Sequence, residues 1–109
     1  MHQANVVALS RQLLVTAATH HSRRAGETVY GAHQTTLHQT VIALVGGAGL
    51  AEHESPGEAT LQVLTGRVRL VAGDRSEEGV AGDLLVIPPA RHSLEALEDS
   101  VVLLTVARG

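Results

Sequence analysis

The sequence predicts an all-β fold preceded by a single amphipathic α-helix, and three observations lead to this expectation. Beyond Gly26 the apolar residues fall into about eight or nine short runs, each bounded by turn residues. No run with a helical period lies between them, which excludes parallel β-α-β units. Residues 6–20 alone repeat with a helical period, so the one expected helix comes first.

The composition indicates one small domain with an aliphatic core. The 109 residues are expected to divide into a helix with its connection at 1–26 and a β-barrel at 27–109, within a single domain overall. An apolar fraction of 44% argues against disorder. Phe and Trp are absent and Tyr30 is the only aromatic residue, so Val, Leu, Ile and Ala must fill the core.

The charged residues exclude several classes of partner. The formal net charge is −3, and Arg23 and Arg24 are the only adjacent cations, so no nucleic-acid partner is expected. Cysteines are absent, which leaves histidines and carboxylates as candidate metal ligands. No segment approaches the roughly 18 apolar residues of a membrane span. The apolar N-terminal run lacks the basic start of a signal peptide, so a cytoplasmic protein without a membrane partner is expected.

The helix expected over residues 6–20 has one apolar side. That side consists of Val6, Leu9, Leu13, Leu14, Ala17 and Ala18. Asn5 precedes the run and is a candidate N-cap. The helix is expected to end before Gly26 and to cover either a sheet or a partner subunit.

The β-type runs follow in order along the chain. They are expected at 28–33, 37–45, 50–54, 60–65, 67–72, 75–80, 84–87, 93–97 and 101–106. Turn residues separate them, including GGAG at 46–49, Ser55-Pro56-Gly57, Gly66, Gly73-Asp74 and Gly82-Asp83. Short strands at this spacing are typical of sandwiches and barrels.

Three phrases of the sequence carry a resemblance to a known family. They are H-x-S-P-G-E at 53–58 followed by LQVLTGRVRL at 61–70, the AGD turn at 81–83, and GDLLVIPPARH at 82–92. Together they resemble the two motifs of a small single-domain cupin, G-x5-H-x-H-x3,4-E-x6-G and G-x5-P-x-G-x2-H-x3-N. The resemblance covers roughly residues 37–107. It implies a double-stranded β-helix barrel, which in this family is often a homodimer.

The metal-ligand positions of these motifs match the chain in part. His53 falls at the first histidine position, while Ser55 and Ala59 occupy the second histidine position and the glutamate position. In the second motif Ser93 stands where histidine is expected, and His92 precedes it by one residue. The resemblance therefore implies His53, and His92 if the corner is one residue shorter, as ligands of a possible divalent metal: Fe, Zn, Ni or Mn. It is equally open that the protein binds no metal.

Two other polar residues are candidates for the missing ligand. Glu58 lies one residue before the glutamate position, although a solvated turn acid is the ordinary alternative. Gln62 is a polar residue in an otherwise apolar strand. In a regular strand Gln62 and Ala59 face opposite sides, so only one of them points into the barrel unless a bulge intervenes.

His38 and Tyr30 are the remaining candidates for the pocket. The structural alternative for His38 is a hydrogen-bonded barrel histidine, and that for His92 is a corner histidine whose ring bonds to the backbone. Arg91 is a candidate partner for a carboxylate ligand, or an ordinary surface arginine. The sequence places no polar group with certainty inside the barrel, because the facing of each strand is undecided.

Two functions follow as hypotheses. The leading one is a small-ligand-binding or weakly metal-binding module without established catalysis, which holds a small apolar or amphipathic molecule of unknown identity in an aliphatic barrel. The alternative is a metal-dependent cupin enzyme, dioxygenase-like or isomerase-like, with an open histidine site. A purely structural dimer is a third possibility. Whether the protein is an enzyme is undecided, and a homodimer is expected.

Overall fold

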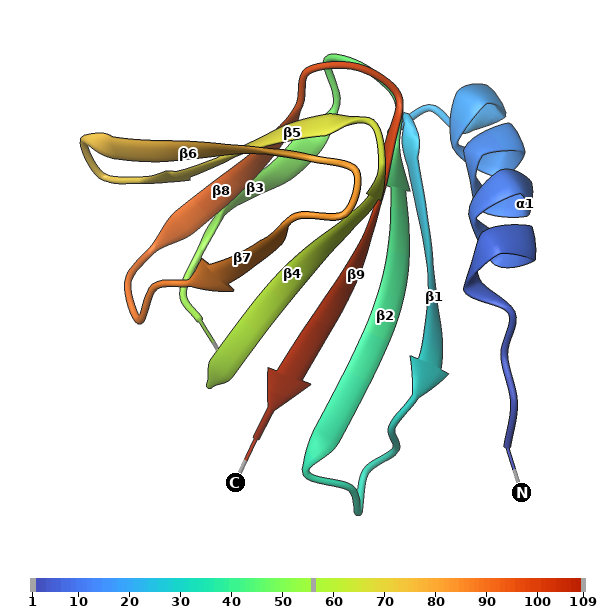
Figure 1. Cartoon of the computed structure of the whole chain (residues 1–109), viewed down its shortest axis with the longest axis horizontal. Coiled ribbons are helices and arrows are strands. Elements are labelled where there is room, and N and C mark those ends of the chain that lie inside the picture. Colours follow the sequence, from blue (N-terminus) through green and yellow to red (C-terminus); the bar gives the residue numbers. More distant parts are fainter. Residues whose placement is uncertain (1, 56, 109) are drawn as a thin grey trace.

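One helix and nine strands form the part of the chain that the computed structural model describes, residues 2–55 and 57–108 (Figure 1). The helix α1 covers Val6–Thr19. The strands are β1 (Arg24–Tyr30), β2 (Leu37–Leu44), β3 (Gly49–His53), β4 (Glu58–Thr65), β5 (Arg67–Ala72), β6 (Arg75–Val80), β7 (Leu84–Ile87), β8 (His92–Ala96) and β9 (Ser100–Ala107). Pro56 of the expected Ser55-Pro56-Gly57 corner lies outside the described residues.

The strands form two sheets in which every pairing is antiparallel. One sheet has the order β1-β2-β9-β4-β7, and the other has the order β3-β8-β5-β6. Figure 1 shows the two sheets facing each other, with α1 beside β1 at the far edge. The prediction of an all-β fold with one N-terminal helix is confirmed.

A continuous aliphatic core fills the space between the sheets. Strand alternation produces it, because inward residues of β4 are buried while Gln62 between them is exposed. Its fully or nearly fully buried members are Leu44, Ala59, Leu61, Val63, Val68, Leu70, Leu85, Ile87, Leu94, Ala96, Val102 and Val106. No aromatic side chain takes part, as the composition predicted.

The helix packs on the outer face of the five-stranded sheet. Leu13 and Ala17 lie against Val41, Ala43 and Val101 in a second buried cluster. The predicted N-cap is confirmed, because the Asn5 side-chain oxygen accepts a hydrogen bond of 3.0 Å from the Ala8 N–H. The apolar side of α1 therefore covers a sheet of its own chain. Within the described residues, no helix has the length and hydropathy of a membrane-spanning segment.

The first strand begins earlier than expected, at Arg24 instead of residue 28. The chain turns out of the helix at Arg23, which has a left-handed φ of 61°. Gly26 lies within β1 opposite Ile42, so it does not end the helical connection as predicted. The expected boundary after residue 26 therefore falls inside β1.

Gly66 makes the tight connection between β4 and β5. Its φ of 89° lies in the left-handed region. A Cβ atom at this position would overlap the Ser100 hydroxyl and the Asp99 carbonyl. Ser100 is fully buried, and its hydroxyl accepts a bond of 3.0 Å from the Arg67 N–H just beyond the turn. The turn is thus fixed by both backbone conformation and contact with β9.

Candidate functional site

His53 and His92 meet at the end of the four-stranded sheet. His53 ends β3 and His92 begins β8, and the two residues are direct partners in the β3–β8 pairing. Their ring centroids are 4.4 Å apart with an interplanar angle of 61°, an edge-to-face arrangement. His92 is only 4% exposed, whereas His53 reaches the surface. The sheet register thus brings together the two histidines that the sequence singled out.

Both rings are held in the same way by the backbone. The Nδ1 atom of His53 lies 2.9 Å from the Ala51 carbonyl oxygen. The Nδ1 atom of His92 lies 2.9 Å from the Ala90 carbonyl oxygen. A carbonyl only accepts hydrogen bonds, so each Nδ1 carries the proton, and in a neutral ring Nε2 then has a free lone pair.

Neither Nε2 atom has a protein hydrogen-bond partner among the described residues. No buried side-chain nitrogen or oxygen in that part of the chain is both sealed from solvent and unpaired. The Nε2 atom of the buried His92 therefore reaches accessible space. His92 therefore makes the backbone hydrogen bond expected of a corner histidine through Nδ1, and its other ring nitrogen, Nε2, stays open.

The accessible space is a cavity of about 260 Å³ between the two sheets. The four-stranded sheet contributes the two histidines, and the five-stranded sheet contributes an aliphatic wall. Three residues of this wall lie side by side in the sheet, because Ala59 pairs with Val106 on one side and with Ile87 on the other. The lining residues are His53, Glu54, Ser55, Ala59, Ile87, His92, Leu104, Val106 and Arg108.

The facing of β4 corrects one expected ligand. Ala59 is 4% exposed and lines the cavity, and β4 continues regularly from Ala59 to Val63 in its pairing with β9. Gln62 is consequently exposed on the other face of the sheet. The structure thus removes Gln62 from the candidate site and leaves a methyl group at the position that corresponds to the glutamate.

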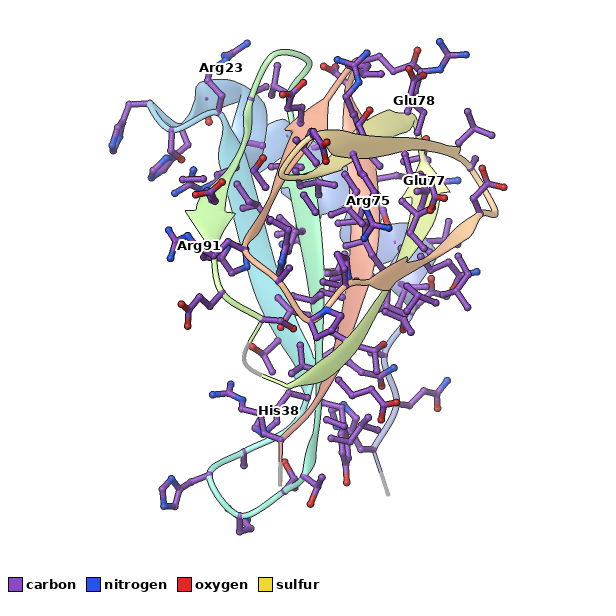
Figure 2. The ribbon with its side chains drawn as sticks, turned by 90° about the vertical axis from the view of Figure 1, so that its left-hand side faces the viewer. Arg23, His38, Arg75, Glu77, Glu78 and Arg91 are labelled. Atoms are coloured by element: carbon purple, nitrogen blue, oxygen red, sulfur yellow. The ribbon has the colours of Figure 1, made fainter. Side chains whose placement is uncertain are left out.

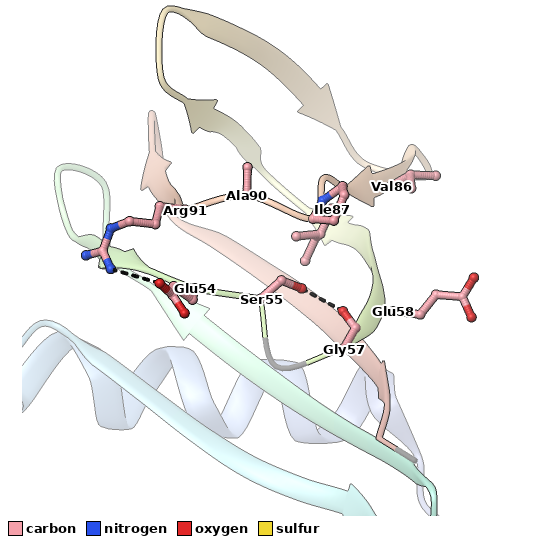
Figure 3. Close-up of a pocket in the computed structure, with 9 residues that line it drawn as sticks. Glu54, Ser55, Gly57, Glu58, Val86, Ile87, Ala90 and Arg91 are labelled. Atoms are coloured by element: carbon pink, nitrogen blue, oxygen red, sulfur yellow. Dashed lines mark hydrogen bonds and ion pairs between the residues drawn. The ribbon is translucent and has the colours of Figure 1, made fainter.

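Glu58 is also turned away from the histidines. It is exposed and lines a neighbouring open cleft instead of the histidine cavity. Figure 3 shows its carboxylate pointing outward from that cleft. The Ser55 hydroxyl donates a 2.6 Å hydrogen bond to the Gly57 carbonyl, so its proton is already used.

The donor set does not fit a complete metal centre. A first-row metal site usually takes three or four protein ligands. No group of three or more His, Cys, Asp or Glu residues suited to a metal occurs in residues 2–55 and 57–108. The two imidazole nitrogens therefore supply only two of these ligands.

Arg91 forms the charged border of the same region. It lies 3.1 Å from a Glu52 oxygen and 3.9 Å from a Glu54 oxygen. Figure 3 shows its side chain directed toward Glu54 and away from the cleft. All three side chains are more than half exposed, so these ion pairs contribute little to stability. Arg91 thus pairs with acids of the protein.

His38 lines a different cavity from the one between His53 and His92. Its Nε2 atom lies 2.9 Å from the Thr35 carbonyl oxygen. Figure 2 shows it near the lower end of the barrel, well below Arg91. The cavity there measures about 450 Å³ and is lined by His33, Gln34, Thr35, Thr36, His38 and Arg108.

Tyr30 does not take part in either cavity. A register shift after Thr28 places Tyr30 opposite Gln39. Gln39 faces away from the barrel interior, because the adjacent residue His38 pairs with the inward-facing Val106. The Tyr30 ring is 45% exposed and lies edge-on to His2 at a centroid distance of 6.4 Å. The expectation that Tyr30 lines the pocket is wrong, because the shift turns it to the opposite face.

Arg108 is the residue of the site that the sequence analysis missed. The two-residue alternation of Val102, Leu104 and Val106 extends to it, and that pattern is the signal that could have identified it. Its backbone N–H donates a 2.9 Å hydrogen bond to the Thr36 carbonyl. Arg108 lines both the histidine cavity and the cavity beside His38.

Comparisons by sequence and by structure give different results. No protein family model matches the sequence, and no curated protein gives a significant match. Among solved structures, a conserved protein of unknown function from Streptococcus pyogenes is 25% identical with a TM-score of 0.73, covering 83% of this chain and 78% of its own.

Two further solved structures are similar over comparable lengths. An RmlC-like cupin from Desulfovibrio desulfuricans is 27% identical with a TM-score of 0.68, covering 77% of this chain and 81% of its own. A cupin superfamily protein from Desulfitobacterium hafniense is 15% identical with a TM-score of 0.72, covering 79% and 78%. The shared feature is the barrel itself.

Proposed function

We propose that this chain, which is a small cupin domain, is a binding module for a small amphipathic molecule. The molecule is held between the paired imidazoles of His53 and His92 and the aliphatic wall opposite them. The observation that carries the proposal is the fixed orientation of both rings, each with its Nδ1 atom bonded to a backbone carbonyl, at the lining of one cavity. The proposal includes no catalytic step.

The chemistry of the cavity defines what it would bind. A lone pair on a neutral Nε2 accepts a hydrogen bond, so it selects an O–H or N–H group on the ligand. The wall formed by Ala59, Ile87, Leu104 and Val106 favours a hydrocarbon body. A volume of about 260 Å³ limits the ligand to a small molecule.

A pair of ring compounds of almost equal size tests this selection. Cyclohexanol offers an O–H donor, whereas cyclohexanone offers only an acceptor. At pH 8 we expect cyclohexanol to bind and to raise the melting temperature, by an amount that grows with its concentration relative to its dissociation constant. Cyclohexanone is expected to bind more weakly. NMR titration of the histidine ring protons would locate the contact.

Matched variants separate the cavity from the rest of the surface. His53→Ala is expected to weaken cyclohexanol binding, because it removes one acceptor at an exposed position. Gln62→Ala and His33→Ala are the controls, since neither side chain lines the cavity. Equal binding of the alcohol and the ketone, or unchanged binding in His53→Ala, would contradict the proposal.

A metal-dependent enzyme is the second candidate. The hydrogen bonds of both rings favour it. Histidines that bind metals through one ring nitrogen commonly donate a hydrogen bond from the other N–H to a backbone carbonyl or carboxylate, and both rings do so here. Against it, two imidazoles provide fewer ligands than a stable site needs. A metal would therefore be weakly held and completed by water or by the bound molecule.

Elemental analysis of untagged protein tests this second candidate. The wild type, His53→Ala and His92→Ala would be compared after exposure to Fe, Zn, Ni and Mn. We expect little retained metal in any of the three. Near-stoichiometric metal in the wild type that disappears in both variants would favour the enzyme instead.

A further inference from the structure

Arg108 introduces a positive charge into the wall of the histidine cavity. It follows Val106 in the inward alternation of β9 and lines the cavity together with His53 and His92. The hydrogen bond from its N–H to the Thr36 carbonyl, 2.9 Å long, extends the pairing of β9 with the β2 side beyond Ala107. The backbone that carries the guanidinium is thereby fixed at the cavity.

This arginine has no acidic partner within the described residues. The ion pairs of residues 2–55 and 57–108 involve Arg67, Arg69 and Arg91. Glu54, the one acid in the lining of the cavity, pairs with Arg91 at 3.9 Å. The Arg108 guanidinium is therefore available to a group that enters the cavity.

A guanidinium selects a particular kind of group. It has five N–H donors and no acceptor, and its planar shape matches the two oxygens of a carboxylate. A phosphate would also satisfy these donors. Glu54 in the same lining repels a second negative charge. This repulsion favours a singly charged carboxylate over a doubly charged phosphate.

Three features of one cavity must be matched by the same ligand. The Nε2 atoms of His53 and His92 need a hydroxyl donor, the wall of Leu104 and Val106 needs a short hydrocarbon segment, and Arg108 needs an anion. We infer that the ligand is a short hydroxycarboxylic acid. Its hydroxyl donates a hydrogen bond to the Nε2 atom of one of the two imidazoles, and its carboxylate pairs with Arg108. This inference rests on the binding function proposed above and specifies its ligand class.

The test compares 3-hydroxybutyrate with its methyl ester, which keeps the hydroxyl and loses the charge. Titrations followed by NMR at pH 8 give the dissociation constants. We expect the acid to bind about tenfold more tightly than the ester, because a hydrogen bond to a charged group contributes more than one between neutral groups. Arg108→Gln should abolish this difference by weakening binding of the acid more than that of the ester.

Arg75→Gln is the matched control for the loss of one positive charge. Arg75 lines a separate cleft formed with Leu70, Leu84 and Val86, so its replacement should leave both dissociation constants unchanged. Butyrate, which lacks the hydroxyl, should bind more weakly than 3-hydroxybutyrate. Propyl phosphate should bind more weakly than the acid.

The outcomes distinguish this inference from the function on which it rests. If the ester binds as tightly as the acid, or if Arg108→Gln keeps the preference, the carboxylate contact is wrong while binding of a hydroxyl compound stands. Tighter binding of propyl phosphate would replace the carboxylate by a phosphate. Butyrate binding as tightly as 3-hydroxybutyrate would refute the hydroxyl contact. Failure of the acid, the ester and cyclohexanol alike would refute the proposed function itself.

Discussion

Ala59 on β4 and His92 on β8 line the same cavity from opposite sheets, and each is only 4% exposed. Ala59 occupies the position at which the cupin motif has its glutamate. The two imidazoles and the missing carboxylate therefore belong to one place in the barrel. A side chain with an oxygen ligand at residue 59 would complete a set of three.

Replacing Ala59 by Glu is expected to create a metal site. His53, His92 and the new carboxylate would supply three ligands, the number found in many catalytic zinc sites. Zn²⁺ in hundredfold excess over its dissociation constant would then stabilise the variant by about 2.7 kcal/mol. Thermal unfolding with and without Zn²⁺ measures this gain.

Thr60→Glu is the control for the Ala59 variant, because the neighbouring position faces the other side of β4. It adds the same charge without reaching the histidines. Equal Zn²⁺ stabilisation in the two variants would show that the gain does not come from the cavity. If a folded Ala59→Glu protein is not stabilised by Zn²⁺, the two rings and the new carboxylate cannot bind one metal ion together.

Gly66→Ala should destabilise the protein more than Gly73→Ala. Both glycines have positive φ, 89° and 63° respectively, so both alanines incur a backbone cost of about 1–2 kcal/mol. Only at Gly66 does the added Cβ meet Ser100 and Asp99, whereas at Gly73 it meets open space. Urea unfolding would measure the difference, and equal losses would contradict the contact with β9.

Leu13→Ala should lower the free energy of unfolding by about 2–5 kcal/mol. Leu13 is 7% exposed and packs between α1 and the five-stranded sheet. Val15 on the same helix is 71% exposed, so Val15→Ala should change stability by less than about 0.5 kcal/mol. Similar losses in the two variants would mean that the helix is not held by this face.

The expected homodimer stays a prediction that sedimentation can test. Because Leu13 is used within the chain, its replacement should lower stability without dissociating a dimer. We expect wild type and Leu13→Ala to sediment as the same dimeric species at temperatures where both are folded. A monomeric wild type would refute the dimer, and a monomeric Leu13→Ala variant would place α1 in the interface.

Local signals in the sequence determined most of the fold. Alternation in the run from Arg67 to Ala72 and the turn residues around it placed that strand correctly. The start of β1 differs from the prediction, because a glycine such as Gly26 often follows the end of a helix, whereas here it lies in a strand opposite Ile42. A glycine alone does not distinguish these two roles.

The sequence predicts individual residues of the site but not which of them face the same cavity. His53 and His92 were identified by motif, but the choice between Ala59 and Gln62 depends on which face of β4 is inward, and the sequence leaves that open. Arg108 was missed because its place at the cavity comes from pairing between distant strands. Such pairing is not visible in local sequence patterns.

The position of β3 has a consequence for how occupancy of the cavity could be observed. β3 is an edge strand that pairs only with β8 in the described sheet, and its last residue is His53. Edge strands open locally without unfolding of the core, and such opening would separate His53 from His92. A molecule bound in the cavity between the two rings would therefore hold this strand closed. Its binding would slow deuterium exchange at the β3 amides while leaving the central strand β9 unchanged.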